Sequence, residues 1–365
     1  MTISVSGDAV AHALRRRIAE RGHVTVAEFM ELALGGYYAD RDPLGLRGDF
    51  VTAPEVSQMF GEMIGLWCVD LWTRMGKPAP FILAELGPGR GTLMADALRA
   101  ARVSPDFLAA AEIHLVEINA TLIAAQKAAL QGVTPRWHKT FDTLPPGPML
   151  LIANEFWDAL PIHQFVMSDS GWKERVIVAK DEDAFAFSEA EPGPELGLLR
   201  PEHKSADPCD IAEISPAGLR LAAALGRRFA RMPGAALIID YGPTRSGLGD
   251  SFQALKQHCS HDPLVAPGSA DLTAHVDFAA LAAAACEAGA KAYGPTRQGA
   301  FLDVLGIELR AETLKAKSDP AQCAEIDAAL DRLIGAQGMG SLFKVLALTA
   351  PNAPQPAGLD PRDHD

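Results

Sequence analysis

The sequence lacks paired cysteines and long runs of basic residues. Its five cysteines are widely spaced, and none stands in a Cys-x-x-Cys pair. We therefore expect reduced thiols in a cytosolic compartment. Lysine and arginine do not gather into blocks, and the net charge is −13. This charge disfavours nucleic acid as the main partner, because such binding rests on neutralised phosphates, and it fits a cationic substrate better.

The sequence also lacks an apolar segment of the kind that directs a chain to or through a membrane. The first residues have no basic flank followed by an apolar core. The alanine-rich stretch 278–290 is interrupted by Glu287 and is too short to span a bilayer. We expect a soluble, cytoplasmic protein without membrane insertion. Its 365 residues fit one large domain with additions, or two domains.

A glycine-rich motif interrupts an apolar run. Residues 81–93 read FILAELGPGRGTL, in which a strand pattern ends in three alternating glycines and a helix pattern follows. Glycines permit backbone angles and a close ligand approach that a Cβ would block. The start of a helix offers unpaired N–H groups to an anionic group. The motif predicts a nucleotide-binding turn that includes Gly87, Pro88, Gly89, Gly91 and Thr92.

The spacing of the glycines favours one kind of nucleotide. Dinucleotide-binding folds usually read G-x-G-x-x-G. Here Gly87, Gly89 and Gly91 read G-x-G-x-G, with an acid, Glu85, two positions upstream. This is the pattern of S-adenosylmethionine (SAM) enzymes. For the glycine-rich loop alone, a plain structural turn is the alternative interpretation.

A second acid ends the next apolar run. Residues 113–117 read IHLVE, where the second strand of a doubly wound sheet should end. The carboxylate of Glu117 can accept both ribose hydroxyls of a bound adenosyl group at this place. The alternative is a solvated residue at the end of a strand.

Strand and helix patterns alternate from residue 81 onward, which implies a parallel sheet. A hairpin pattern at 172–187 interrupts this alternation after the strand that ends near Ala153. Residues 8–33 read as two short helices, and a turn-rich segment begins at Gly35. The strands are expected at 81–86, 113–117, 149–153, 235–240 and 341–349.

These patterns divide the chain into three regions. Residues 1–78 form an N-terminal helical and lid region. Residues 79–350 form the α/β domain, with an insertion at about 162–214 that contains the hairpin. Residues 351–365 form a proline-rich tail that we expect to be flexible.

Polar side chains follow the strand at 149–153. They are Asn154, Glu155 and Asp158, with two aromatic residues between them. Because ligands in such sheets lie beyond the carboxyl ends of the strands, we expect the reaction centre here. A strand-to-helix junction with Asn154 as a helix cap is the alternative. The turn at 240–242 ends another strand and belongs either to this centre or to a plain turn.

The segment before the first long apolar helix is a candidate lid, from Gly48 to Glu55. Thr52 and Glu55 have the spacing of a capping box. Asp49 belongs either to the lid or to an ordinary turn. Residues 275–278 line the substrate cleft or begin a helix that Asp277 caps. His258, Cys259 and His261 are crowded on one loop without the usual ligand spacing, so no metal site is expected.

Eight strings resemble, in this order, the MidA-type SAM-dependent protein arginine methyltransferases, a family that includes a mitochondrial complex I assembly factor. The resemblance covers roughly residues 8 to 350. Two positions depart from the expected pattern, Ala53 in place of serine and Ser251 in place of threonine. The strings are GDFVTAPEVSQMFGE, ELGPGRGTLMAD, HLVEIN, ANEFWDALPIHQF, EISPAGL, ALIIDYG, ADLTAHVDF and GSLFKVLAL.

The resemblance implies a Rossmann-like, seven-stranded class I methyltransferase sheet. It implies SAM as cofactor, with the three glycines near its methionine part and Glu117 on its ribose. Asn154 and Glu155 would face the methyl group. The substrate implied is an arginine of a protein, and the resemblance implies a subunit of respiratory complex I as that protein. The sequence leaves open whether the chain forms a homodimer.

A carboxylate would help arginine react, because a protonated guanidinium is a poor nucleophile. Glu155 is our first choice to hold the guanidinium, with Asp158 and Glu55 as partners. Two other functions stay open at this point. One is a SAM-binding assembly chaperone with little catalysis, and the other is an NAD-dependent oxidoreductase.

Overall fold

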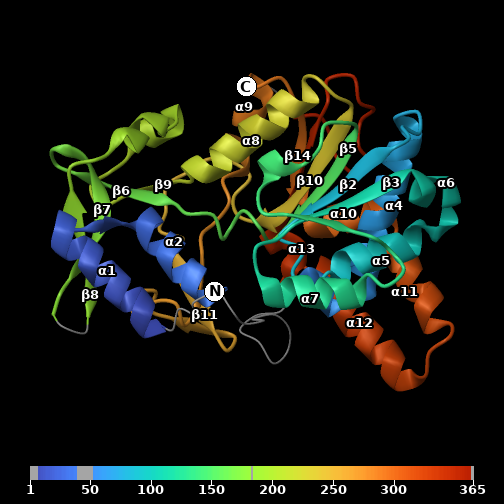
Figure 1. The fold of residues 1–365 in the computed structure, drawn as a ribbon, viewed down its shortest axis with the longest axis horizontal. Coiled ribbons are helices and arrows are strands. Elements are labelled where there is room, and N and C mark those ends of the chain that lie inside the picture. The colour runs from blue at the N-terminus through green and yellow to red at the C-terminus, as the bar shows by residue number, and fades with distance from the viewer. Residues whose placement is uncertain (1–6, 39–51, 182–183, 363–365) are drawn as a thin grey trace. The chain divides into compact units, whose positions relative to one another are not determined.

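The computed structural model describes residues 7–38, 52–181 and 184–362. Its chain divides into two compact units, each assembled from three segments (Figure 1). Unit 1 comprises Met1–Phe50, Trp157–Arg220 and Arg245–Ala280. Unit 2 comprises Val51–Phe156, Leu221–Thr244 and Leu281–Asp365. The boundaries expected at 78 and 350 do not separate these units, while the expected insertion at 162–214 lies within the middle segment of unit 1.

A seven-stranded sheet forms the centre of unit 2. The four pairs from β10 through β5, β2 and β3 to β4 are parallel, and β15 is antiparallel to both of its neighbours, β10 and β14. The Rossmann-like, seven-stranded sheet that we predicted is therefore confirmed. The strands, in spatial order, are β14 (Lys291–Arg297), β15 (Phe343–Thr349), β10 (Gly234–Tyr241), β5 (Met149–Asn154), β2 (Phe81–Leu86), β3 (Ala111–Val116) and β4 (Arg136–His138).

The central strands of this sheet are buried along their whole length. Every residue of β2 and β5 is buried, which is why both read as apolar runs, interrupted only by Glu85 and Asn154, rather than as alternating patterns. Figure 1 shows α4, α5 and α7 on one side of this sheet. The helices of unit 2 are α3 (Ala53–Val56), α4 (Gln58–Arg74), α5 (Thr92–Ala100), α6 (Pro105–Ala110), α7 (Ala120–Ala129), α10 (Gln298–Leu305), α11 (Ile307–Lys315), α12 (Pro320–Ile334) and α13 (Met339–Leu342).

Glycines allow α4 and α5 to pack closely. A Cβ at Gly65 would lie 2.4 Å from the carbonyl oxygen of Ala97, and a Cβ at Gly61 would lie 2.7 Å from Cβ of Asp96. Neither distance is compatible with a side chain, so only glycine fits at these two positions. The close packing fixes α4 against the helix that follows the glycine-rich motif.

Unit 1 packs two helices against two small antiparallel sheets. The first sheet has the order β1-β7-β6-β9, with β8 on β7, and the second has the order β12-β11-β13. The predicted hairpin is present as β7 and β8. The elements are α1 (Gly7–Arg21), β1 (Val24–Thr25), α2 (Val26–Tyr37), β6 (His163–Ser168), β7 (Gly171–Ala179), β8 (Phe185–Ala190), β9 (Ile211–Ile214), β11 (Gln253–Lys256), β12 (Cys259–His261) and β13 (Asp271–Thr273).

Helix α2 extends further than the sequence predicts. Thr25 and Glu28 form a complete capping box at its start, and the helix continues through both glycines to Tyr37. A Cβ at Gly36 would lie 2.4 Å from a methyl group of Val10 on α1. The expectation that a turn begins at Gly35 is therefore wrong, because close packing against α1 requires a small residue inside the helix.

Two helices, α8 (Pro216–Phe229) and α9 (Phe278–Glu287), begin in unit 1 and continue in unit 2. Four short 3-10 helices complete the described elements, at 101–103, 141–143, 194–198 and 201–205. Among the described residues, no helix is long and apolar enough to cross a membrane.

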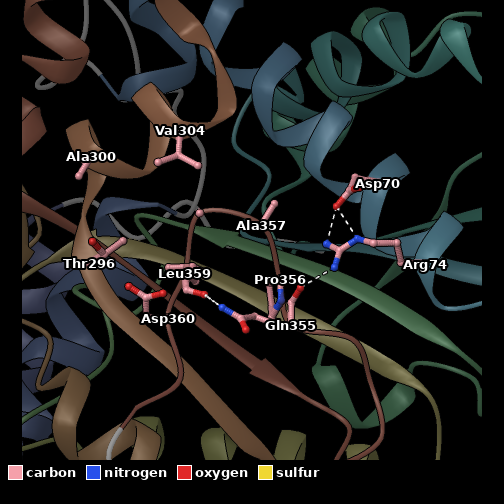
Figure 2. Close-up of a pocket in the computed structure, with 11 residues that line it drawn as sticks. Asp70, Arg74, Thr296, Ala300, Val304, Gln355, Pro356, Ala357, Leu359 and Asp360 are labelled. Atoms are coloured by element: carbon pink, nitrogen blue, oxygen red, sulfur yellow. Dashed lines mark hydrogen bonds and ion pairs between the residues drawn. The ribbon is translucent and has the colours of Figure 1, made fainter.

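The C-terminal segment packs on unit 2 as far as Arg362. Nε1 of Trp67 donates to the carbonyl of Ala357 at 3.1 Å, and Leu359 is 3% exposed. Figure 2 shows Arg74 of α4 donating to the carbonyl of Gln355 beside a shallow groove of about 690 Å³. The structure thus differs from the flexible tail that we expected, because apolar burial and main-chain acceptors hold residues 351–362.

Candidate active site

The candidate site lies at the carboxyl edge of the seven-stranded sheet. Strand β2 pairs with β3 on one side and with β5 on the other, so the chain order reverses between β2 and β5. Leu86 at the end of β2 lies opposite Ala153. The glycine-rich loop and the Asn154–Glu155 pair therefore leave the sheet side by side. Ligands of open α/β sheets bind at such a reversal.

The glycine-rich loop needs its glycines for two reasons. Gly87, Gly89 and Gly91 have φ angles of 59°, 53° and 83°, which side chains disfavour. A Cβ at Gly87 would also lie 2.9 Å from Cδ2 of Phe156. Gly91 is the N-cap of α5, and its N–H donates to the carbonyl of Pro88 at 2.8 Å. The loop exposes backbone and a helix start, as the motif predicts.

Glu85 is a buried acid directly before this loop. It is 2% exposed, and burial raises the pKa of its carboxyl to about 8. Its Oε2 atom has no hydrogen-bond partner in the part of the chain that the structure describes. A buried oxygen of this kind is unfavourable unless a ligand or water pairs with it. The site therefore has an acceptor suited to a cationic ligand.

Glu117 lies beyond the end of β3, and its carboxylate is held from two directions. Oε1 accepts from the N–H groups of Ile118 and Asn119, both at 2.8 Å. Oε2 accepts from Nε2 of Gln126 at 3.3 Å. Burial raises the pKa of Glu117, against these hydrogen bonds, which lower it. The carboxylate has a fixed orientation and retains acceptor capacity on Oε2.

Gln126 of α7 links this acid to the glycine-rich loop. Its Nε2 also donates to the carbonyl of Gly89 at 2.7 Å, and its Oε1 accepts from Nε1 of Trp137 at 2.8 Å. A Cβ at Gly91 would lie 3.3 Å from Gln126. Gln126 and Trp137 were not predicted as site residues, because neither stands within a recognisable local motif.

Glu55 contacts the start of α5 instead of capping its own helix. Its carboxylate accepts from Oγ1 of Thr92 at 2.6 Å and from Nη1 of Arg90 at 3.4 Å. Thr52 is the N-cap of α3 but makes no side-chain cap hydrogen bond. The predicted capping box is therefore wrong. The long helix α4 begins later, with Ser57 as its N-cap.

Asn154 and Glu155 form a hydrogen-bonded pair at the end of β5. Nδ2 of Asn154 donates to Oε1 of Glu155 at 3.0 Å, and the N–H of Ala53 donates to the same oxygen at 3.0 Å. Glu155 has a φ of 50°, which is uncommon for a residue with a side chain. Such strain is typical of functional sites. Ala53 contributes through its backbone, so serine is not required for this contact.

Asn154 carries a second buried acceptor. The residue is 8% exposed, and its Oδ1 has no hydrogen-bond partner among the described residues. Asp158, which we predicted in the same group, belongs to unit 1, where its carbonyl accepts from the N–H of Ala274 at 2.9 Å. Residues 48–51 of the candidate lid, which include Asp49, lie outside the described residues.

The histidine-rich loop of the sequence, residues 258–261, lies largely on strand β12. Cys259 and His261 lie on β12, and Cys259 is exposed. Within the described ranges, no group of three or more His, Cys, Asp or Glu side chains is arranged to hold a metal ion. Oδ1 of Asp277 accepts from the N–H of Ala280 at 2.9 Å, so Asp277 makes a hydrogen bond of the capping type.

A family model described as "Putative S-adenosyl-L-methionine-dependent methyltransferase" matches residues 63–296. The chain belongs to this methyltransferase family. The matched range contains the glycine-rich loop, Glu117 and the Asn154–Glu155 pair. The predicted MidA-type family membership is confirmed by relatives that match most of the chain.

The relatives are named as arginine methyltransferases. "Protein arginine methyltransferase NDUFAF7 homolog, mitochondrial" of Drosophila melanogaster is 38% identical over 375 residues, which cover 93% of this chain and 84% of the relative. "Protein arginine methyltransferase NDUFAF7, mitochondrial" of Homo sapiens is 34% identical over 368 residues, which cover 92% and 82%. The cytoplasmic location that we expected is contradicted, because these relatives are mitochondrial proteins.

A solved structure shares the fold and contains a cofactor product. A protein from Burkholderia thailandensis bound to S-adenosyl-homocysteine superposes with a TM-score of 0.82 at 28% identity, over 98% of this chain and 96% of that one. The cofactor of this chain's family is SAM. The residues here fit it, because Glu85 offers a buried acceptor to a cation and the glycine-rich loop leaves space beside the backbone.

Proposed function

We propose that this methyltransferase transfers the methyl group of SAM to an arginine side chain of a protein. The observation that carries the proposal is the similarity, over most of this chain and most of each relative, to proteins named protein arginine methyltransferases. The position of Glu155 supports it as well. A carboxylate directly beyond β5, next to the glycine-rich loop, is chemically suited to a guanidinium.

We propose the following residues as the cofactor site. Glu85 and Asn154 offer buried acceptors, and Glu117 accepts the ribose hydroxyls on its Oε2 side. Gln126 joins this group because it connects Glu117 to the loop. The loop residues contribute backbone and a helix start rather than side chains. They are Gly87, Pro88, Gly89, Gly91 and Thr92.

Glu155 would orient the substrate and redistribute its charge. When bound, SAM supplies a methyl group on a positively charged sulfur. Glu155 grips two N–H groups of the guanidinium and draws its positive charge away from the nitrogen that reacts. Asn154 and the N–H of Ala53 hold the Glu155 carboxylate in place. Proximity of correctly oriented groups can lower such a barrier by about 7 to 11 kcal/mol at best.

Glu55 and Asp158 stay proposed partners in catalysis. Glu55 accepts hydrogen bonds from both Thr92 and Arg90, so its role would be to position the start of α5. Asp158 follows Glu155 closely in the chain, with only Phe156 and Trp157 between them.

We propose that the protein substrate is a subunit of respiratory complex I and that its methylation supports assembly of the complex. We also propose that the chain can form a homodimer, which light scattering can test.

Transfer of labelled methyl from SAM into a lysate of a strain lacking this gene tests the proposal. We expect one labelled protein whose acid hydrolysate contains methylarginine. The Gly89→Val protein is the control, because valine at a φ of 53° is strained and fills the loop. A lysate that holds unassembled complex I subunits and gains no label would contradict methyl transfer.

The Glu155→Gln variant separates catalysis from cofactor binding. Glutamine keeps an oxygen that can accept from Ala53, so the local structure should persist while the negative charge is lost. We expect SAM affinity to stay within about twofold and methyl transfer to fall roughly a hundredfold or more. Full methylation by Glu155→Gln would remove Glu155 from the proposed role.

A further inference from the structure

Three hydrogen bonds occupy the side-chain amide of Gln126. Nε2 donates to the carbonyl of Gly89 at 2.7 Å and to Oε2 of Glu117 at 3.3 Å, and Oε1 accepts from Nε1 of Trp137 at 2.8 Å. An amide offers two N–H donors and one oxygen acceptor. Both donors and the acceptor are therefore in use, with partners on the glycine-rich loop, beyond the end of β3 and on β4.

The partners of this amide determine its orientation. The indole N–H of Trp137 can only donate, whereas a carbonyl and an ionised carboxylate can only accept. A flipped amide would place Oε1 against the acceptors of Gly89 and Glu117, and its N–H groups against the indole N–H. Gln126 is 0% exposed, so bulk water cannot replace a lost partner. The indole thus favours the orientation in which the amide donates to Glu117.

The indole of Trp137 is itself held by its surroundings. Strand β4 pairs in parallel with β3, and Trp137 lies opposite Leu115. The ring packs against the apolar core of unit 2, and Nζ of Lys127 lies over it, 5.2 Å from the ring centroid. Lys127 follows Gln126 on α7, so one helix contacts both the face and the N–H of the indole. These contacts leave the N–H little freedom to turn away from Gln126.

Strand β4 also reaches Glu117 through the backbone. The N–H of Glu117 donates to the carbonyl of His138 at 2.9 Å. Burial raises the pKa of Glu117, and the hydrogen bond from Gln126 opposes this rise. Two adjacent residues of one short strand, Trp137 and His138, therefore hold the side chain and the main chain of Glu117, and the amide between them favours its ionised form.

We propose that Trp137 is a positioning residue of the cofactor site, which acts through Gln126 to orient the Glu117 carboxylate toward the ribose hydroxyls. The inference rests on the proposed function and deepens it, because it takes Glu117 as the acceptor of the ribose. A carboxylate that is already oriented accepts both hydroxyls without a further ordering cost on binding. Trp137 thereby makes the site selective for a ribose over a sugar without hydroxyls.

The affinities of two ligands for the full-length protein test this assignment by calorimetry. The ligands are S-adenosylhomocysteine and its analogue that lacks both ribose hydroxyls. The wild type should bind S-adenosylhomocysteine roughly thirtyfold or more tightly than the analogue, because hydrogen bonds to a carboxylate are lost. Trp137→Phe removes the N–H and keeps an aromatic ring, and should lower this ratio to about fivefold. A residue that only fills space would weaken both ligands alike when replaced.

Trp72→Phe is the matched control for the loss of an indole hydrogen bond. Nε1 of Trp72 donates to the carbonyl of Pro78 at 2.9 Å. Pro78 precedes β2, whereas the glycine-rich loop follows it, so this contact lies near the opposite edge of the sheet. Trp72→Phe should keep the wild-type ratio of the two affinities. The inference is overturned if this control lowers the ratio as far as Trp137→Phe does.

A double-variant cycle shows whether Trp137 acts through Gln126. Gln126→Met removes the amide and keeps the length of the side chain. In this background Trp137→Phe should change the ratio by less than about twofold, because no amide is left to orient. Equal effects with and without the amide would overturn the proposed route. If Trp137→Phe does not fold, replacement of Trp137 by benzothienylalanine, which has sulfur in place of the N–H, takes its place in the cycle.

The wild-type ratio separates failure of this inference from failure of the proposed function. Equal wild-type affinities for the two ligands would overturn Glu117 as the ribose acceptor, and the inference with it. A wild type that discriminates, beside a folded Trp137→Phe protein with the same ratio, overturns the inference alone. The expected ratios, but no methylarginine from the lysate assay, support the inference and contradict the proposed methyl transfer instead.

Discussion

Two carboxylates, one in each unit, are buried among different partners. Glu62 in unit 2 accepts from Arg310 at 2.7 and 3.0 Å and from Arg99 at 3.0 Å. Glu213 in unit 1 accepts from neutral donors, which include Nε2 of Gln164 at 2.7 Å. Burial raises the pKa of Glu213. One unit thus compensates a buried charge with arginines, whereas the other surrounds it with neutral donors.

The difference indicates what each environment is suited to. The arginines around Glu62 join α4, α5 and α11, so this carboxylate already has its cations. Buried acids with neutral donors keep an electrostatic attraction for a cation from outside. Glu85 in unit 2 resembles Glu213 in that burial raises its pKa, and its Oε2 atom has no hydrogen-bond partner among the described residues. We therefore assign Glu85 to the proposed cofactor site and Glu62, which is paired with arginines, to the scaffold.

The pH dependence of stability should show the largest effect, through Glu85. Its pKa in the folded protein, about 8, lies above the ordinary value of 4.5. The protonated form thus stabilises the folded protein fully below pH 4.5, and this contribution is lost as the pH rises through 8. Relative to Glu85→Gln, the wild type should lose about 3 to 5 kcal/mol of unfolding free energy between pH 5 and pH 9.

Urea unfolding of both proteins across this pH range measures the effect. Glu112→Gln is the control, because Glu112 forms an exposed ion pair with Arg136 and its loss should change little. Parallel pH profiles for the wild type and Glu85→Gln would show that the folded protein compensates the charge of Glu85, as it does that of Glu62.

Removal of the charge at Glu62 should destabilise unit 2. Glu62→Gln leaves two arginines without their shared carboxylate, which costs several kcal/mol in a buried site. The side chains of Arg99 and Arg310 are 41% and 31% exposed and can regain water, so we expect about 2 kcal/mol. Urea unfolding at pH 7 measures it. A change below about 0.5 kcal/mol would show that arginines do not compensate this acid.

The same substitution in unit 1 should have a smaller effect. Glutamine at position 213 can still accept from Gln164 and can donate to Oγ of Ser251, a hydroxyl that serves as donor or acceptor. It also removes a charge that burial disfavours. We expect Glu213→Gln to change the unfolding free energy by less than about 1 kcal/mol at pH 7. A loss as large as that of Glu62→Gln would remove the contrast between the units.

Cysteines of the two units should differ in how readily a thiol reagent modifies them in the native protein. Cys68 of unit 2 is 1% exposed, and burial raises its pKa to about 12. Cys209 and Cys259 of unit 1 are exposed. We expect iodoacetamide at pH 8 to modify both exposed cysteines in the native protein and to leave Cys68 unmodified, as read by peptide mass spectrometry. Equal labelling of Cys68 would indicate local opening of α4.

Local sequence patterns predicted the sheet and its glycine-rich loop. Alternating glycines and an acid after an apolar run report constraints within a few residues, and the structure has the loop where the pattern places it. Thr52 and Glu55 show the limit of such patterns. Their spacing fits a capping box, but Glu55 binds Thr92, which is 37 residues away. A local motif cannot report a competing partner that tertiary packing supplies.

Long-range partners explain the other differences. Gln126 reaches the carbonyl of Gly89 across 37 residues, and Tyr38 reaches Asp271 across 233. No periodicity or spacing links residues so far apart. The C-terminal segment was expected to be flexible from its prolines, yet Nε1 of Trp67 donates to the carbonyl of Ala357 across 290 residues. Amino-acid composition indicates how a segment behaves in isolation. It does not report whether another part of the fold offers a surface on which the segment can pack.

Unit 1 is assembled from three chain segments that leave the ribosome at different times. The apolar residues of α1 and α2 belong to a core completed by Leu272 and Ala274. A ribosome that adds about 5 to 20 residues each second leaves the first segment without those partners for roughly 10 to 50 seconds. During that interval the nascent helices expose their apolar faces, so chaperone supply in the expression host should limit the yield of this protein.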